Sequence, residues 1–93
     1  MVELLADLSP ETPWGERKIA ANRLGNLRNP EAVPGLAAAL RTERFWMVRF
    51  AIIQALEMIG DPGAIPTLQQ AADKDDFQAV RSYAGKTVRR LSH

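Results

Sequence analysis

The sequence predicts an all-α fold, a short α-solenoid of about six antiparallel helices arranged as three helix pairs, with a 32-residue period. A proline-containing segment occurs twice, as NPEAVPGL at residues 29–36 and as DPGAIPTL at residues 61–68. When residues 14–61 are aligned with residues 46–93 without a gap, 11 of 48 pairs are identical, whereas this composition would give roughly four by chance. Between these segments, apolar residues recur at the spacing of an amphipathic helix rather than that of a strand.

The identities extend through the whole overlap. They are Trp14/Trp46, Arg17/Arg49, Leu24/Leu56, Pro30/Pro62, Ala32/Ala64, Pro34/Pro66, Leu36/Leu68, Ala39/Ala71, Phe45/Phe77, Val48/Val80 and Arg49/Arg81. The same shift applied to the N-terminal residues gives Leu4/Leu36, Ala6/Ala38, Leu8/Leu40 and Glu11/Glu43. We therefore expect a single domain over 1–93, divided into a half-unit (1–13), two units (14–45 and 46–77) and a final helix (78–91).

The first elements follow from local signals. We expect a short helix from Val2 to Leu8, which has no partner helix before it. Thr12 and Pro13 are expected to cap the next helix, since a hydroxyl oxygen accepts a free amide and proline is tolerated at a first helical position.

The middle of the chain is expected to form a helix over residues 43–59. Its apolar positions share one face: Val48, Ile52, Ala55, Leu56 and Ile59. Gly60, Asp61 and Pro62 then end it.

The shorter helices begin at the repeated Asx-Pro segments. Asn29 and Asp61 are suited to accept the free amides of a helix start, and the following prolines suit a first position. We expect the first of these helices to begin within 30–34 and end at 41–42, the second to end at 74–75, and the last helix to run from about Asp76 to Leu91.

The composition excludes several classes. Hydrophobic residues make up 46%, charged residues 25%, and the formal net charge is +1, as in ordinary globular proteins. There is no cysteine, so the chain forms neither a disulfide nor a thiolate site. No apolar run approaches the roughly 18 residues that a membrane span requires. We expect a cytoplasmic protein with no membrane partner.

The second unit resembles the HEAT-like repeats named from phycobilisome (bilin) lyases, whose unit is V-R-x-x-A-A-x-A-L-x-x-I-G-D-P-x-A-V-P-x-L. Residues 48–68 read VRFAIIQALEMIGDPGAIPTL. The resemblance implies stacked antiparallel helix pairs whose second helices line the concave side. The chain departs from the family where an acidic D-x-D-P loop is usual, reading ERFW at 43–46 and DDFQ at 75–78.

Arg17, Arg49 and Arg81 recur at the period and allow two interpretations. The structural one, which we favour, is that each guanidinium binds the side chain of the G-D-P turn, which is an acid in such repeats and is Asp61 or Asn29 here. The other is a basic ladder for phosphate groups.

A second basic set lies near the ends of the first helix of the first unit and of the last helix. It comprises Arg23, Arg28, Lys86, Arg89 and Arg90. We expect these cations to oppose the negative ends of helix dipoles. A nucleic-acid footprint would need a surface of positive charge alone. The shorter helices mix positive and negative residues, which argues against a nucleic-acid partner.

The sequence shows no catalytic constellation. The single histidine, His93, is the last residue, so we expect no histidine-based metal or proton-relay site. Asp73, Asp75 and Asp76 read as solvated caps after a helix. The sequence therefore predicts no catalytic residue, no metal, no cofactor and no enzyme.

Trp46, Phe50 and Ile53 form a partner-binding candidate on the back of the middle helix. At 100° per residue they lie together, opposite the apolar face described above. The equivalents of Phe50 and Ile53 in the other units are small or polar, namely Lys18 and Ala21 in the first unit and Ser82 and Gly85 in the last. One interpretation is that the middle helix, flanked on both sides, buries a wider arc; the other is an exposed apolar patch that contacts a partner.

Two functions follow. We favour a non-catalytic HEAT-like scaffold that binds another protein or self-associates. The alternative, implied only by the resemblance, is an accessory factor in bilin lyase or phycobilisome handling. Binding of a nucleic-acid backbone is a weaker third.

Overall fold

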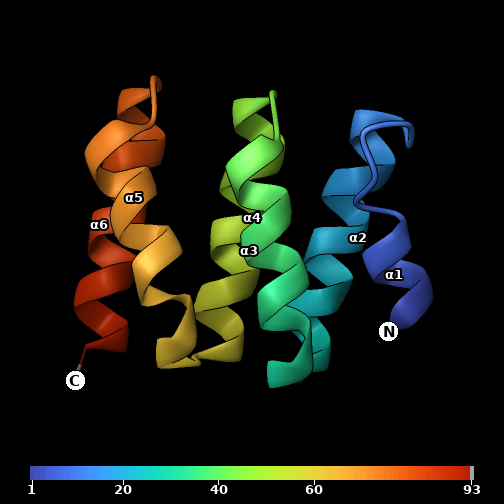
Figure 1. Cartoon of the computed structure of the whole chain (residues 1–93), viewed down its shortest axis with the longest axis horizontal. Helices are drawn as coiled ribbons and strands as arrows, with labels where there is room; N and C mark the ends of the chain where they lie inside the picture. The colour runs from blue at the N-terminus through green and yellow to red at the C-terminus, as the bar shows by residue number, and fades with distance from the viewer. Residues whose placement is uncertain (93) are drawn as a thin grey trace.

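The computed structural model describes residues 1–92, which form six α-helices and no strand. They are α1 (Val2–Ala6), α2 (Trp14–Leu27), α3 (Val33–Thr42), α4 (Trp46–Ile59), α5 (Ile65–Lys74) and α6 (Gln78–Leu91). Two 3-10 turns, η1 (Pro30–Ala32) and η2 (Pro62–Ala64), precede α3 and α5. Figure 1 shows a row of three helix pairs with the termini at opposite ends. The predicted all-α solenoid is confirmed.

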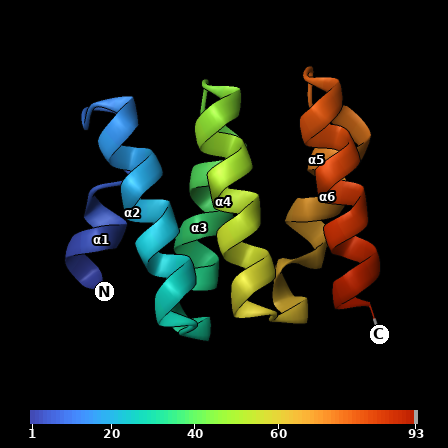
Figure 2. The same cartoon turned by 180° about the vertical axis from the view of Figure 1, so that it is seen from behind.

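The helices form two layers. In Figure 1 the nearer layer is α1, α3 and α5, and the view from behind in Figure 2 brings α2, α4 and α6 to the front. Within its layer α4 packs between α2 and α6, and it also contacts α3. The three loops that join α1 to α2, α3 to α4 and α5 to α6 lie together along one edge of the row. We call this the loop edge.

The period predicted from the sequence is visible in the helices themselves. Helices α2, α4 and α6 start at Trp14, Trp46 and Gln78, one period apart, and α3 and α5 start at Val33 and Ile65. Asn29 Oδ1 accepts the Glu31 N–H at 3.0 Å, and Asp61 Oδ1 accepts the Gly63 N–H at 2.9 Å. These bonds confirm the amide-accepting role expected for Asn29 and Asp61.

Several helix starts differ from expectation. Helix α4 begins at Trp46 rather than residue 43, and α6 begins at Gln78 rather than Asp76. The residues just before them, Phe45 and Phe77, have extended backbone. The reason is that residues 43 and 75 are held in their loops by arginines on α2 and α4, as described below.

The N-terminal boundaries also differ. Helix α1 ends at Ala6, and α2 has Pro13 as its N-cap residue with no side-chain cap bond. The Thr12 cap prediction is therefore wrong. Instead of its hydroxyl capping the helix, Thr12 offers its backbone carbonyl to the Arg17 guanidinium.

The equivalent residues Arg28 and Gly60 end α2 and α4 in the left-handed backbone region, with φ of 53° and 76°. Glycine adopts this conformation without a Cβ clash, whereas arginine does so at a steric cost. The same turn is therefore built from a favourable residue in one unit and a less favourable one in the other.

One continuous core joins the helix pairs. Its largest fully buried side chains are Leu24, Leu36, Ile52, Ile53, Leu56, Leu68, Val48, Val80 and Thr87. Helices α2 and α4 approach closely at Gly25, where an added Cβ would lie 2.9 Å from Ala55 Cα and 3.2 Å from Met58 Sδ. This packing fixes the spacing of the layers and so positions the loop edge.

Candidate functional site

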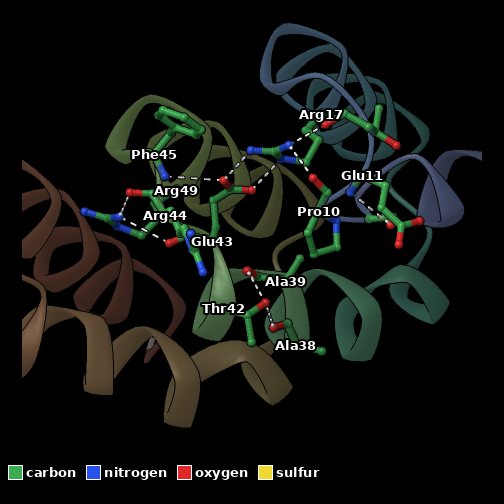
Figure 3. Close-up of polar contacts among 12 residues, drawn as sticks. Pro10, Glu11, Arg17, Ala38, Ala39, Thr42, Glu43, Arg44, Phe45 and Arg49 are labelled. Atoms are coloured by element: carbon green, nitrogen blue, oxygen red, sulfur yellow. Dashed lines mark hydrogen bonds and ion pairs between the residues drawn. The ribbon is translucent and has the colours of Figure 1, made fainter.

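Arg17, at the start of α2, reaches along the loop edge to the loop that joins α3 to α4. Its Nε and Nη2 donate to the two carboxylate oxygens of Glu43, each at 2.9 Å. Its Nη1 donates to the backbone carbonyls of Pro10, at 3.4 Å, and Thr12. Figure 3 shows this guanidinium between its own loop and Glu43. The planar fork thereby fixes α2 against the α3–α4 loop.

Arg49 repeats the arrangement one period later. Its Nε and Nη2 donate to Asp75 at 2.8 and 3.0 Å, and Nη2 also donates to Asp76 at 3.0 Å. Its Nη1 donates to the carbonyls of Glu43, at 3.2 Å, and Arg44, at 2.9 Å. These contacts use all five N–H donors of the guanidinium, so Arg49 has no donor left for a ligand.

The structural role predicted for these arginines stands, but the predicted acids are wrong. The partners are Glu43 and Asp75, each 26 residues after its arginine. Arg49 lies at the loop edge, whereas Asp61 follows the far end of α4, roughly 18 Å away at 1.5 Å per residue. Two signals in the sequence could have identified the partners. Glu43 and Asp75 each lie 26 residues after an arginine of the repeat and two residues before a Phe.

Asp75 is also not the solvated cap that the sequence indicated. Its side chain is 7% exposed and Glu43 is 5% exposed, whereas Asp76 is 92% exposed. Asp75 Oδ1 additionally accepts the Phe77 N–H at 2.9 Å, just before α6. Its carboxylate therefore binds the α5–α6 loop to α4 and helps to start α6.

Two clefts open beside these ion pairs, one repeat apart. The first, of 550 Å³, lies between the α1–α2 loop and α3 and is lined by Leu8, Pro10, Arg17, Ala39, Thr42, Glu43, Arg44 and Phe45. The second, of 320 Å³, lies between α3 and α5 and is lined by Leu40, Arg41, Glu43, Arg49, Thr67, Gln70, Ala71, Lys74, Asp75 and Asp76. Most lining positions of the first cleft recur one repeat later in the second.

The second cleft is the better suited to a ligand. Its floor contains the Arg49–Asp75 pair, whose charges offset each other. Arg41 and Lys74 are exposed cations at its rim, and Arg41 Nη1 donates to Thr67 Oγ1 at 3.2 Å. With hydrogen-bonding groups on Thr67 and Gln70 beside apolar Leu40 and Ala71, the cleft can hold an elongated, partly apolar molecule that carries anionic groups.

The predicted Trp46, Phe50 and Ile53 surface is not a single exposed patch. Trp46 is 41% exposed and stacks on Phe77 with ring centroids 4.6 Å apart. Phe50 is half-buried and stacks on Tyr83 at 4.5 Å. Ile53 is 0% exposed. Ile53 is therefore not part of an exposed patch; for this residue the first of the two interpretations holds, because α4, flanked by α2 and α6, buries a wider arc.

Trp46 and Phe50 do line a groove on the α2, α4 and α6 layer. This groove has a volume of 220 Å³, lies between α2 and α4, and is lined by Lys18, Asn22, Trp46, Met47, Phe50, Ala51 and Gln54. Partner binding by Trp46 and Phe50 stays a prediction, now confined to this groove.

A polar network between α4 and α6 escaped the sequence reasoning. The Tyr83 hydroxyl donates to Glu57 Oε1 at 2.9 Å, and Arg90 forms an ion pair with Glu57 Oε2. Burial raises the pKa of Tyr83 to about 12, and the hydrogen bond and negative charge of Glu57 add to the shift. Tyr83 and Glu57 are 26 residues apart in the sequence, and only the pairing of the two helices brings them together.

The remaining ionisable groups show no metal-like arrangement. Within residues 1–92, no three His, Cys, Asp or Glu side chains gather in a group that could hold a metal ion. His93, singled out above, lies outside the described residues. Across the same part of the chain, every helix is too short or too polar to cross a membrane.

Comparison with known proteins identifies a repeat family and relatives named for bilin chemistry. Residues 2–89 match the family model for HEAT repeats. The bilin biosynthesis protein PecE of Mastigocladus laminosus is 54% identical over 61 residues, covering 66% of this chain and 23% of the relative. PecE of Nostoc sp. is 46% identical over 74 residues, covering 76% and 29%. The phycocyanobilin lyase subunit alpha of Picosynechococcus sp. is 43% identical over 63 residues, covering 68% and 23%.

These relatives correct one prediction. Because the chain is similar to a protein named as a lyase subunit, the prediction of no enzyme is wrong. The chain spans less than a third of the length of these relatives. The match over residues 2–89, together with the stacked helix pairs, shows that the chain belongs to the HEAT-repeat family.

Proposed function

We propose that this chain is a helical-repeat part of a bilin lyase-type protein and that its second cleft contacts the bilin. The relatives' names supply the ligand class. The observation that carries the placement is the cleft itself, a 320 Å³ space between α3 and α5 with two exposed cations at its rim. Pockets that hold small molecules begin at about this size.

The chemistry of the cleft suits such a pigment. A bilin is an open chain of four pyrrole-type rings that carries carboxylate side chains. Guanidinium and ammonium groups bind carboxylates through charge-assisted hydrogen bonds, which assigns Arg41 and Lys74 to the acidic groups. The apolar surfaces of Leu40 and Ala71 would lie against the rings, with Thr67 and Gln70 beside their polar edges.

The adjacent first cleft extends the same surface. Since the two clefts are one repeat apart and share Glu43 in their linings, they offer an elongated site in register with an elongated ligand. The Arg17–Glu43 and Arg49–Asp75 pairs line the clefts with charges that offset each other, and the exposed Asp76 adds one carboxylate to the lining of the second cleft.

An absorbance titration tests this proposal. Mixing the chain with phycocyanobilin should shift the pigment's visible absorbance in a saturable way. Arg41→Glu and Lys74→Glu should each weaken binding about tenfold or more, because each replaces an attraction with a repulsion. Lys18→Glu makes the same charge change in the α2–α4 groove and should leave binding unchanged.

Two results would overturn the assignment. An absorbance that stays the same at saturating protein would exclude bilin contact by this chain. Equal loss of binding in all three variants would show that bulk charge, and not the second cleft, controls the interaction.

A second candidate function is protein binding through the α2–α4 groove. Helical-repeat arrays use extended surfaces for such contacts, and this groove presents Trp46, an aromatic residue of the kind that anchors interfaces. In an affinity capture with this chain as bait, Trp46→Ser should abolish retention of the partner protein. Trp14→Ser removes the equivalent and similarly exposed tryptophan and should retain the partner. Matched capture by both variants would refute the groove as the contact.

A further inference from the structure

The arginine ladder along the loop edge has a third member, Arg81. It follows Arg49 by one period and lies in the first turn of α6, as Arg49 lies in the first turn of α4. Its Nη1 donates to the Asp75 carbonyl at 2.5 Å, the contact that Arg49 makes with the Glu43 carbonyl. The guanidinium of Arg81 is thus anchored to its own loop in the same way.

What differs is the carboxylate. In Arg17 and Arg49, Nε and Nη2 bind an acid in the next loop along the loop edge. Within residues 1–92, Arg81 forms no ion pair, and its Nε and Nη2 donate to no protein acceptor. Among residues 1–92, the Arg81 guanidinium therefore binds its own loop, as the other two arginines do, but it has no carboxylate partner.

The opposite end of the row carries the complementary group. Glu11 lies in the α1–α2 loop, one repeat before Glu43 and two repeats before Asp75. It is exposed, and among the described residues it has no arginine partner. Figure 3 places Glu11 in the loop beside Pro10, at the N-terminal side of the first ion pair.

The charges of the two ends agree with this pairing. At the N-terminal end, α1, the following loop and the start of α2 expose Glu3, Asp7 and Glu16 as well as Glu11, beside the base Arg23, whereas α6 exposes the bases Lys86 and Arg89. The more acidic and the more basic parts lie at opposite ends of the row. One molecule cannot bring its own ends together, but two molecules in line can.

We propose that a second copy of this chain docks head to tail, placing its α1 and α2 beside α5 and α6 of the first copy, with Arg81 pairing with Glu11 of the second copy. The register follows from the repeat. Each paired arginine meets an acid 26 positions later, and a copy displaced by three repeats brings its Glu11 to that position relative to Arg81. Both helical layers then continue without interruption.

The contact would be driven mainly by charge. The apolar residues of α4 are not repeated in the outer helices. The equivalent of Ile53 in α6 is Gly85, and the equivalent of Val48 in α2 is Glu16. These changes reduce the apolar area that the ends could bury, so screening by salt should weaken the association strongly. Because the two contacting faces differ, the contact is heterologous and leads to rows or rings rather than to a closed symmetric dimer.

Sedimentation velocity over a concentration series tests the proposal. At low ionic strength the wild-type chain should form dimers and longer assemblies that dissociate as salt is added. Glu11→Arg and Arg81→Glu should each weaken association at least about tenfold by placing like charges together. The double variant, carrying both changes, restores opposite charges across the contact and should associate again.

Matched controls make the outcome decisive. Arg44→Glu makes the same charge change as Arg81→Glu in the middle of the loop edge and should leave association intact. Circular dichroism checks that each variant remains helical, and the exposed Glu11 provides a test if Arg81→Glu unfolds. A monomer at every concentration at low salt, or failure of the double variant to recover, would overturn the proposal. Association lost in Trp46→Ser but not in Glu11→Arg would also overturn it, by locating the contact in the α2–α4 groove.

Discussion

At the scale of single residues, the most constrained side chain is Arg49. Its side chain is 11% exposed and its partner Asp75 is 7% exposed. A buried carboxylate that loses its counter-charge retains the full cost of desolvation. Loss of Arg49 therefore destabilises the fold in two ways: its hydrogen bonds are lost, and the buried Asp75 carboxylate is left without a counter-charge.

Arg49→Ala is expected to lower the free energy of unfolding by about 3 kcal/mol, because it leaves Asp75 buried and unpaired. Urea denaturation followed by circular dichroism measures the change. Arg41→Ala removes an exposed arginine and should cost no more than about 0.5 kcal/mol. Equal midpoints for the two variants would contradict a structural role for the ion pair.

Tyr83 predicts a pH dependence at the alkaline end. Its pKa is about 12 in the folded chain against an ordinary value of 10.0, so folding favours the neutral hydroxyl. The stability that this provides is present below pH 10 and is lost as the pH rises from about 10 to 12. Since Tyr83 is the only tyrosine, absorbance of the tyrosinate form reports it alone.

Glu57→Gln is the matched variant for this titration. It keeps a side-chain oxygen that can accept from the Tyr83 hydroxyl but removes the negative charge, so the pKa should fall toward 10 while remaining raised by burial. A wild-type tyrosinate midpoint at the ordinary value would show that the hydroxyl is not held as described.

At the scale of the elements, the contact between α2 and α4 depends on the absence of a side chain. Gly25 faces Ala55 and Met58 at distances that leave no room for a Cβ. Interiors are packed closely enough that even one added carbon displaces its neighbours. The two helices can therefore approach only because residue 25 is glycine.

Gly25→Ala is expected to destabilise the chain by about 1–3 kcal/mol, since α2 and α4 must separate to accommodate the methyl group. Gly15→Ala is the control on the same helix, because its added Cβ would meet no atom within 4 Å. It should instead stabilise the chain by up to about 1 kcal/mol through helix propensity. Thermal unfolding of both variants should show opposite signs; destabilisation by both would disprove the packing argument.

At the scale of the whole molecule, the central position of α4 determines which surfaces are available. Flanked by α2 and α6, it buries a wide arc that includes Ile53, while Trp46 stays exposed at the loop edge. Of the predicted partner-binding residues, only Trp46 and Phe50 remain at a surface. The array, and not the helix alone, assigns each residue to core or groove.

Ile53→Ala is expected to cost about 3 kcal/mol, because it removes buried methyl groups and leaves a cavity in the shared core. Ile19→Ala changes the same residue type at a site that is 52% exposed and should cost no more than about 0.5 kcal/mol. Chemical denaturation of the two variants checks this. Similar losses would imply that Ile53 is accessible to solvent, as in the second interpretation of the sequence.

Much of the fold was readable from the sequence because its signals are local or periodic. The Asx-Pro segments specify where α3 and α5 begin, Gly60 ends α4, and the periodic identities show that the units are equivalent. The starts of α4 and α6 were placed too early, because local propensity does not show that Glu43 and Asp75 bind arginines on α2 and α4.

The candidate site was less predictable, for a related reason. Recurrence of Arg17, Arg49 and Arg81 indicated a structural ladder, yet the choice of acid required knowing which ends of the helices share an edge. The second cleft combines Arg41 on α3 with Thr67 and Lys74 on α5, residues whose proximity depends on how two helices pack. No spacing within one helix could reveal it.

The sequence by itself determined the helices, their period and the equivalence of their positions, since these depend on backbone conformation and on hydrophobic spacing along one chain. Only the tertiary structure decided which carboxylate each arginine binds, that Ile53 is buried, and where the clefts open. These properties depend on distances between separate helices, and those distances are set by side-chain packing across the layers.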